Sequence, residues 1–228
     1  MRLYGIQKLT LLDFPGHLAC TLFTGGCNLR CPFCHNASLV LRPEDQMDND
    51  DVLDFLRERR GRLQGICLTG GEPLIQSGVA EFLSEVREIG YQIKLDSNGC
   101  FPEKLRSLVE KGLVDYVAMD VKNCPERYPE TVGVPELDLG PVRESISFLL
   151  EGTVDYEFRT TVVRELHDEA SLLSLARWIQ GTKRYFLQAF TDSGDLITDK
   201  CSGYKPEELR ELLAAVQTVI PQAKLRGV

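Results

Sequence analysis

The sequence predicts an α/β fold built on an open, parallel sheet of about six strand–helix units. Short apolar runs, most of them rich in β-branched or aromatic residues, alternate along the chain with longer stretches of helical periodicity. Strands that are separated by helices pair in parallel. Polar residues also follow the expected strands, and ligands of such sheets bind at the carboxyl ends of the strands. Because six units are fewer than the eight of a closed barrel, we expect an open, partial (β/α)6 barrel.

The expected strands are short runs bounded by glycine or polar residues. They cover residues 18–24, 65–69, 92–96, 115–121, 154–163 and 184–190. Helical periodicity is clearest in residues 79–89, where apolar residues recur at the spacing of one helix face. Similar stripes run through residues 52–56, 105–113, 142–150, 172–179 and 209–220. No linker rich in Gly, Ser or Pro divides the chain, so we expect one domain of residues 1–228.

Composition argues against two classes of protein. The 228 residues carry a net charge of −8 and show no long basic run, so we expect no nucleic-acid partner. No stretch approaches the roughly 18 apolar residues of a membrane helix. The N-terminus has no apolar run of signal-peptide length, which predicts a cytoplasmic protein. The eight cysteines should then be thiols or metal ligands rather than disulfides.

The segment "GGCNLRCPFCHN" (residues 25–36) brings Cys27, Cys31 and Cys34 close together. A structural zinc site would need a fourth ligand. His35 adjoins Cys34 and is poorly placed for the same tetrahedron, and Cys20 and Cys67 lie in expected strands. Cysteine thiolates also hold iron–sulfur clusters, and three of them would leave one iron of a [4Fe–4S] cluster open to another ligand. We favour the cluster; zinc and a simple redox dithiol are the alternatives.

Further polar motifs follow the later strands of the expected sheet. They are "TGGEP" (69–73), "DSNG" (96–99), "MDVK" (119–122), Arg159 and Gln188. Paired glycines let a backbone approach a ligand closely, and a neighbouring carboxylate can accept hydrogen bonds from an ammonium group. An isolated GGE can equally be a plain strand-to-helix turn. Asp120 and Lys122 share one face of a strand, where they could form an internal ion pair or bind a ligand.

The C-x3-C-x2-C spacing, with Phe33 before the last cysteine, resembles the signature of the radical S-adenosylmethionine (SAM) superfamily. In that family, SAM chelates the open iron and is cleaved reductively to a 5′-deoxyadenosyl radical. The resemblance implies that Gly70, Gly71 and Glu72 hold the SAM amine and that Lys122 binds the SAM carboxylate. It also implies that Asp96 or Asp120 contacts a hydroxyl, a monovalent cation or the partner. The implied cluster ligands are Cys27, Cys31 and Cys34, and the implied cofactor contacts are Phe33, His35, Gly70, Gly71, Glu72, Asp96, Ser97, Asp120, Lys122 and Arg159.

Within this superfamily, the chain looks like the glycyl-radical-enzyme activating enzymes. The resemblance rests on "LLDFPG" (11–16), on Phe23-x-x-Gly26-Cys27 and on the "CHN" that ends the cysteine segment. It is strongest with the longer form of the activating protein of anaerobic ribonucleoside-triphosphate reductase, and weaker with pyruvate formate-lyase activating enzyme. One departure is that His17 follows Pro15-Gly16, with Leu18 where a Lys or Arg is common nearby. The resemblance implies a glycyl-radical enzyme as protein substrate and a flavodoxin or ferredoxin-type electron donor.

Two other functions stay open from the sequence. One is a radical SAM enzyme that acts on a small molecule, such as a deazapurine-forming synthase of similar length. The other is an iron–sulfur sensor or electron carrier that ignores SAM. The motifs after the second, third and fourth expected strands argue against the sensor, because a sensor would have no need of them.

Overall fold

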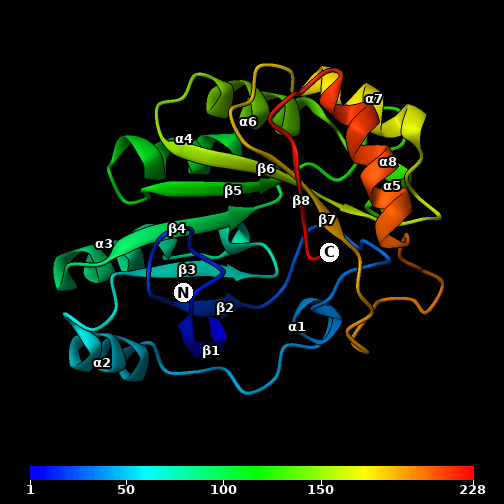
Figure 1. The fold of residues 1–228 in the computed structure, drawn as a ribbon. Helices are drawn as coiled ribbons and strands as arrows, with labels where there is room; N and C mark the ends of the chain where they lie inside the picture. The colour runs from blue at the N-terminus through cyan, green and yellow to red at the C-terminus, as the bar shows by residue number, and fades with distance from the viewer.

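The computed structural model describes all 228 residues and contains one eight-stranded sheet whose strands follow one another in chain order, β1 to β8 (Figure 1). All six expected strands are present and pair in parallel with one another. They are β2 (Ala19–Thr24), β3 (Gly65–Gly70), β4 (Gln92–Ser97), β5 (Tyr116–Asp120), β6 (Asp155–Val162) and β7 (Tyr185–Ala189). The predicted parallel α/β architecture is therefore confirmed.

Two strands at the edges of the sheet were not expected. β1 (Leu3–Thr10) pairs antiparallel with β2, and β8 (Lys224–Arg226) pairs parallel with β7. The sheet is therefore longer than six strands and is not wholly parallel. β1 is largely exposed or half-buried, so its sequence lacks a strong apolar run, and β8 has only three residues. Whether residues 1–228 act as one domain stays a prediction.

Helices cover the outer face of the sheet, as Figure 1 shows. The expected helices are α2 (Asn49–Arg59), α3 (Val79–Ile89), α4 (Pro102–Glu110), α6 (Gly140–Leu150), α7 (Glu169–Trp178) and α8 (Pro206–Gln217). Three short elements were not expected: α1 (Ala37–Leu41), the 3-10 turn η1 (Pro73–Ile75) and α5 (Tyr128–Thr131). No helix is both long enough and apolar enough to cross a bilayer.

Side chains alternate between the two faces of each strand, and this alternation separates the core from the site. In β4, Ile93 and Leu95 are buried in the hydrophobic core beneath the helices, whereas Lys94 and Asp96 point to the opposite, concave face. Burying one such apolar side chain contributes roughly 1.5–3 kcal/mol. The strand register places Asp120 beside Arg159, so the concave face is charged where the outer face is apolar.

The two ends of the sheet carry different loops. The cysteine segment follows the carboxyl end of β2, at the same end as the loops after β3, β4 and β5. The "LLDFPG" segment instead joins β1 to β2 at the opposite end of the sheet. There the Asp13 carboxylate accepts a hydrogen bond from Thr21 Oγ1 at 2.5 Å. The chemistry-bearing motifs therefore meet at the carboxyl ends of the parallel strands.

Candidate active site

The three clustered cysteines line one cavity of about 260 Å³ at the carboxyl ends of the strands. All eight cysteines are free thiols. Cys31 is buried, and Cys27 and Cys34 are half-buried. Burial raises the pKa of all three thiols, that of Cys31 to about 12. Without a cation to stabilise their thiolates, these sulfurs are therefore protonated at neutral pH.

The cysteine segment is anchored by backbone hydrogen bonds to distant parts of the chain. Arg30 N donates to the carbonyl of Val132, just after α5, at 2.8 Å. Thr198 N donates to the carbonyl of Pro32 at 3.1 Å. The Asp195 carboxylate accepts a hydrogen bond from Ser38 Oγ at 2.7 Å. This bond joins the segment after β7 to α1, which directly follows the cysteine segment. These contacts hold the loop in place from two sides.

The two glycines of "TGGEP" pack directly against the start of the cysteine segment. Gly71 N donates to the carbonyl of Thr24 at 2.8 Å, and Glu72 N donates to that of Gly26 at 2.9 Å. A Cβ on Gly71 would collide with the Gly26 carbonyl. Gly70 has a φ of +108°, a conformation that favours glycine. The sequence suggested close approach of a ligand as the reason for these glycines, but close approach of two chain segments already requires them.

Glu72 is buried, with only 1% of its surface exposed, and its carboxylate joins the β3 and β4 loops. It accepts hydrogen bonds from Leu74 N at 3.1 Å, Ser97 Oγ at 3.0 Å and Asn98 N at 2.7 Å. Burial raises the pKa of Glu72 to about 7, although the three donors act to lower it. An ionised carboxylate offers about four acceptor positions, so these contacts leave room for about one further donor.

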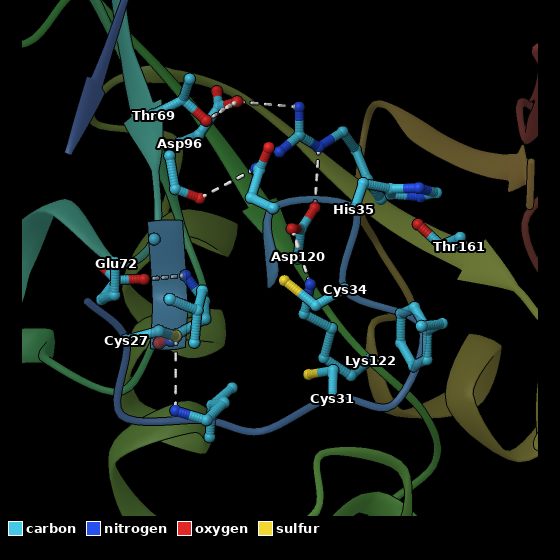
Figure 2. A pocket seen from close by; sticks show the side chains of 18 of the residues that line it. Cys27, Cys31, Cys34, His35, Thr69, Glu72, Asp96, Asp120, Lys122 and Thr161 are labelled. Carbon is cyan, nitrogen blue, oxygen red and sulfur yellow. Dashed lines mark hydrogen bonds and ion pairs between the residues drawn. The ribbon is translucent and has the colours of Figure 1, made fainter. Parts of the chain in front are cut away.

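A chain of five alternating charges crosses the concave face of the sheet. Figure 2 labels three of its members, Asp96, Asp120 and Lys122. Lys122 Nζ lies 2.9 Å from Asp120 Oδ2, and Arg159 Nε lies 2.9 Å from Asp120 Oδ1. Arg159 Nη1 reaches Asp96 Oδ2 at 3.3 Å, and Asp96 also pairs with Lys94. Three cations against two carboxylates leave one net positive charge. We call these residues the ionic chain: Lys94, Asp96, Arg159, Asp120 and Lys122.

Mutual attraction within the ionic chain outweighs the effect of burial on each pKa. Burial alone would raise the pKa of Asp120, but Arg159 and Lys122 hold it well below its usual range. Burial would lower the pKa of Lys122, but Asp120 and the Cys31 sulfur raise it above the ordinary value for lysine. All five groups are therefore charged at neutral pH. Both ends of the ionic chain are lysines, and one of them, Lys122, lies among the clustered cysteines (Figure 2).

His35 and Phe33 form part of the wall of the same cavity. The His35 ring stacks on Phe190 with ring centroids 5.6 Å apart, and burial lowers the pKa of His35. A neutral imidazole at this position is consistent with a packing role and with contact to a ligand. Gln188, on β7, lines the cavity as well, together with Thr161 on β6.

The structure thus brings every residue predicted for the cofactor site into one cavity, while their individual roles stay predictions. Sequence reasoning missed three contributors. Lys94 is buried and pairs with Asp96. Thr69 Oγ1 donates to Asp96 Oδ2 at 3.1 Å, and Asn98 Nδ2 lies 3.7 Å from Cys27 Sγ. Asn98 and Thr69 belong to motifs that were already recognised, but nothing local marks Lys94 as buried.

Two ion-binding possibilities gain no support from the geometry. No group of three or more His, Cys, Asp or Glu side chains is arranged to hold a single metal ion. A zinc ion with Zn–S bonds of about 2.3 Å would need sulfurs within about 4 Å of one another. A monovalent cation near Asp96 or Asp120 is also unsupported, because each carboxylate already pairs with two cationic side chains.

Comparison with known proteins agrees with these motifs. Residues 21–176 match the family model of the radical SAM superfamily. The chain is 31% identical over 234 residues to the Methanocaldococcus jannaschii protein named "Putative glycyl-radical enzyme activating enzyme", covering 98% of this chain and 95% of that protein. It is 31% identical over 144 residues to the pyruvate formate-lyase-activating enzyme of Listeria monocytogenes, covering 56% of each chain.

A solved structure of similar fold is that of SuiB from Streptococcus suis bound to the precursor peptide SuiA, with a TM-score of 0.74 and 16% identity. The match covers 95% of this chain but only 50% of SuiB, and at this identity it supports the fold alone. The family match and the full-length relative go further. The chain is a radical SAM enzyme: it belongs to the radical SAM superfamily and is related to the glycyl-radical enzyme activating enzymes.

Proposed function

We propose that this protein is an activase that uses a [4Fe–4S] cluster and SAM to install a glycyl radical on a partner enzyme. The observation that carries the proposal is a single cavity that holds three free thiols and Lys122, one of the two positive ends of the ionic chain. Thiolates are the protein ligands of iron–sulfur clusters, so the donor set fits the cofactor that the family implies. The relative that matches 98% of the chain supports the activase assignment.

In this proposal Cys27, Cys31 and Cys34 would each bind one iron of the cluster, and the remaining iron would be left for SAM. The cluster and SAM, when bound, would supply the electron and the hydrogen-abstracting radical. The protein contributes placement and exclusion of water. The net positive charge of the ionic chain would also favour cluster binding, because it stabilises the thiolate form of the sulfurs relative to the thiol.

The same cavity offers complementary groups for both ends of an amino-acid moiety. Lys122 would face the SAM carboxylate, since the ionic chain leaves one positive charge unbalanced. The remaining acceptor position of Glu72 and the backbone of Gly70 and Gly71 would face the SAM amine. The other proposed SAM contacts line the walls of the cavity: Phe33, His35, Asp96, Ser97, Asp120 and Arg159.

We further propose anaerobic ribonucleoside-triphosphate reductase as the partner and a flavodoxin or ferredoxin-type protein as the electron donor. The support for the partner is the resemblance of the residues around "LLDFPG" and "CHN" to the activating protein of that reductase. The chain would act as one domain of residues 1–228 on the glycine loop of a protein substrate. The cavity is lined by the loops after the parallel strands, so a loop of a protein substrate would enter it from the carboxyl ends of the strands.

The deciding experiment mixes the anaerobically reconstituted, reduced protein with SAM and the reductase from the same cell. We expect the reductase to gain a glycyl radical, seen as a doublet by electron paramagnetic resonance. The doublet should collapse towards a singlet when the target glycine is α-deuterated. A parallel sample with pyruvate formate-lyase tests the choice of partner. A radical on pyruvate formate-lyase and none on the reductase would support the activase function but contradict the reductase as its partner.

The small-molecule alternative predicts a different result from the same samples. No glycyl-radical enzyme of the source cell would gain a radical, yet a small substrate would be consumed together with SAM. The sensor alternative predicts a bound cluster whose spectrum does not change when SAM is added. Either outcome would contradict the proposed activase.

A further inference from the structure

The side-chain amide of Asn98 points at the sulfur of Cys27. Its Nδ2 atom lies 3.7 Å from Cys27 Sγ, and both residues line the candidate cavity. Hydrogen bonds to sulfur are longer than those to oxygen, because sulfur is the larger atom. A second donor converges on the same sulfur, since the backbone N–H of Leu29 lies 3.4 Å from it. Cys27 Sγ is therefore placed as an acceptor for two N–H groups, and Asn98 supplies one of them from a distant loop.

The orientation of the Asn98 amide is fixed by a neighbour that can only donate. The backbone N–H of Cys100 donates to Asn98 Oδ1 at 3.0 Å. Because a backbone N–H has no acceptor role, the oxygen of the amide must face Cys100 and the nitrogen must face the other way. One hydrogen of Nδ2 is donated to Asn28 Oδ1 at 2.8 Å. The other hydrogen is left for the Cys27 sulfur.

The loop that carries Asn98 is held from two sides by contacts that need no ligand. Asn98 N donates to Glu72 Oε2 at 2.7 Å, which joins the loop to the one after β3. The carbonyl of the next residue, Gly99, accepts from Ser145 Oγ of α6 at 2.8 Å. Gly99 has a φ of +77°, so the chain turns sharply here. The Asn98 side chain is buried, with 6% of its surface exposed, and is fixed in direction before any cofactor binds.

This arrangement has little value for a thiol and more for a thiolate. As a thiol, Cys27 is a weak acceptor, and its own hydrogen can be donated to Asn28 Oδ1 at 3.9 Å. As a cluster ligand the sulfur carries negative charge and no hydrogen, so the two N–H groups become its partners. Hydrogen bonds to a charged acceptor are stronger than neutral ones.

We propose that Asn98 donates a hydrogen bond to the sulfur of cluster-bound Cys27 and thereby raises the reduction potential of the cluster. The inference rests on the proposed function, because only a metal-bound Cys27 is a charged acceptor. Reduction adds one electron from the electron donor and breaks no bond, so the reduced cluster is the more negative form and gains more from the N–H group. Hydrogen bonds to ligand sulfurs are among the factors that set cluster potentials. Asn98 acts through Cys27 and is a positioning residue.

The test is a redox titration of the reconstituted cluster, followed by spectroscopy, in the wild type, Asn98→Ala and the matched control Asn28→Ala. At the potential where half of the wild-type cluster is reduced, Asn98→Ala should show a ratio of reduced to oxidised cluster about threefold to tenfold lower; the tenfold limit corresponds to about 59 mV for one electron. Asn28→Ala should keep the wild-type potential, because it removes the other acceptor of the amide and leaves the donor facing Cys27.

Two results of this titration would overturn the inference. One is an unchanged potential in Asn98→Ala. The other is an equal decrease in Asn28→Ala, since the effect would then come from the contact between the two amides and not from the bond to sulfur.

A second variant, Asn98→Asp, keeps an oxygen for the Cys100 N–H and replaces the donor by a carboxylate oxygen. Its potential should be at least as low as that of Asn98→Ala, and a potential at or above the wild-type value would contradict the inference. Melting temperatures of the metal-free proteins show whether each variant folds. Should neither Asn98 variant take up a cluster while Asn28→Ala does, Asn98 would be needed to assemble the site, and its role in setting the potential would be overturned.

Failure of the inference is distinguishable from failure of the proposed function. A wild-type chain that binds iron, responds to SAM and has the same potential as both Asn98 variants would contradict only the role of Asn98. A wild-type chain that takes up no iron would contradict both.

Discussion

Replacing Lys122 by methionine removes one of the two terminal positive charges of the ionic chain and keeps a side chain of similar length. In the native protein, Lys122 Nζ lies 2.9 Å from Asp120 Oδ2. Asp120 keeps its second partner in the variant, because Arg159 Nε lies 2.9 Å from Oδ1. The carboxylate is therefore not left alone, and the full penalty of about 3–5 kcal/mol for an unpaired buried charge should not apply.

The expected losses follow from one charge-assisted hydrogen bond. Such a bond is worth about 1.5–3 kcal/mol, so SAM affinity should fall by roughly tenfold to a hundredfold if Lys122 binds the SAM carboxylate. Stability of the metal-free protein should fall by an amount in the lower part of that range. Because Asp120 raises the pKa of Lys122 above its ordinary value, this stabilisation is complete at neutral pH and is lost only at strongly alkaline pH. The difference between wild type and variant should therefore stay constant between about pH 6 and pH 9.

Equilibrium binding of SAM to the anaerobically reconstituted proteins measures the effect, with iron content as the check that the cluster is intact. Lys104→Met is the matched control, because Lys104 donates to the Leu74 carbonyl at 2.6 Å and does not line the cavity. The control should bind SAM as the wild type does. Unchanged SAM affinity in Lys122→Met, with the expected loss of stability, would refute the reasoning and leave Lys122 as a member of an internal ion pair.

Three further predictions test other parts of the site. Replacing any one of the three clustered cysteines by alanine should abolish iron binding in anaerobic reconstitution, whereas Cys124→Ala should retain it. A variant of a clustered cysteine that still binds four irons would show that this cysteine is not a cluster ligand. Glu72 has a pKa of about 7 in the folded protein, so it binds more protons there than in the unfolded chain, and its contribution to stability should fall by about 3 kcal/mol as pH rises from about 4.5 to 7. Urea titrations should show that Glu72→Gln lacks this decline, and an identical decline would assign it to another group. Asp13→Ala should lower the yield of glycyl radical more than SAM affinity; equal losses would indicate that the loop only holds the fold through its bond to Thr21.

The six central strands could be predicted because each has a dense apolar face that local sequence reveals. In "QIKLD", Ile93 and Leu95 are buried against the helices. β1 escaped prediction because most of its residues are exposed or half-buried, and its strand conformation depends on pairing with β2. β8 is too short for any periodicity to show, and its place depends on β7 and on the pairing of Arg226 with Glu157.

Some features of the site follow from local sequence, and others depend on contacts between residues that are far apart in the chain. The cysteine spacing and the motifs after the strands are local, so their meeting at one end of the sheet followed from parallel pairing alone. The burial of Lys94 did not, because a lysine between two apolar strand residues is usually on a solvated face. Its partner Asp96 is itself held by Arg159, which is 63 residues away in the sequence.

The distribution of charged and apolar residues over the two faces of the sheet indicates that the ionic chain serves binding rather than stability. Buried ion pairs often contribute less to stability than apolar residues of similar volume would, because desolvation opposes their attraction. The outer face of the same strands shows that this chain can supply an apolar alternative, since Ile93, Leu95, Val117 and Met119 fill the core there. A purely structural role would thus leave the ionic chain without advantage over apolar packing. Three cations against two carboxylates do have an advantage in a site for anionic groups, because the ionic chain carries a net positive charge and one of its lysines, Lys122, lies beside the three sulfurs.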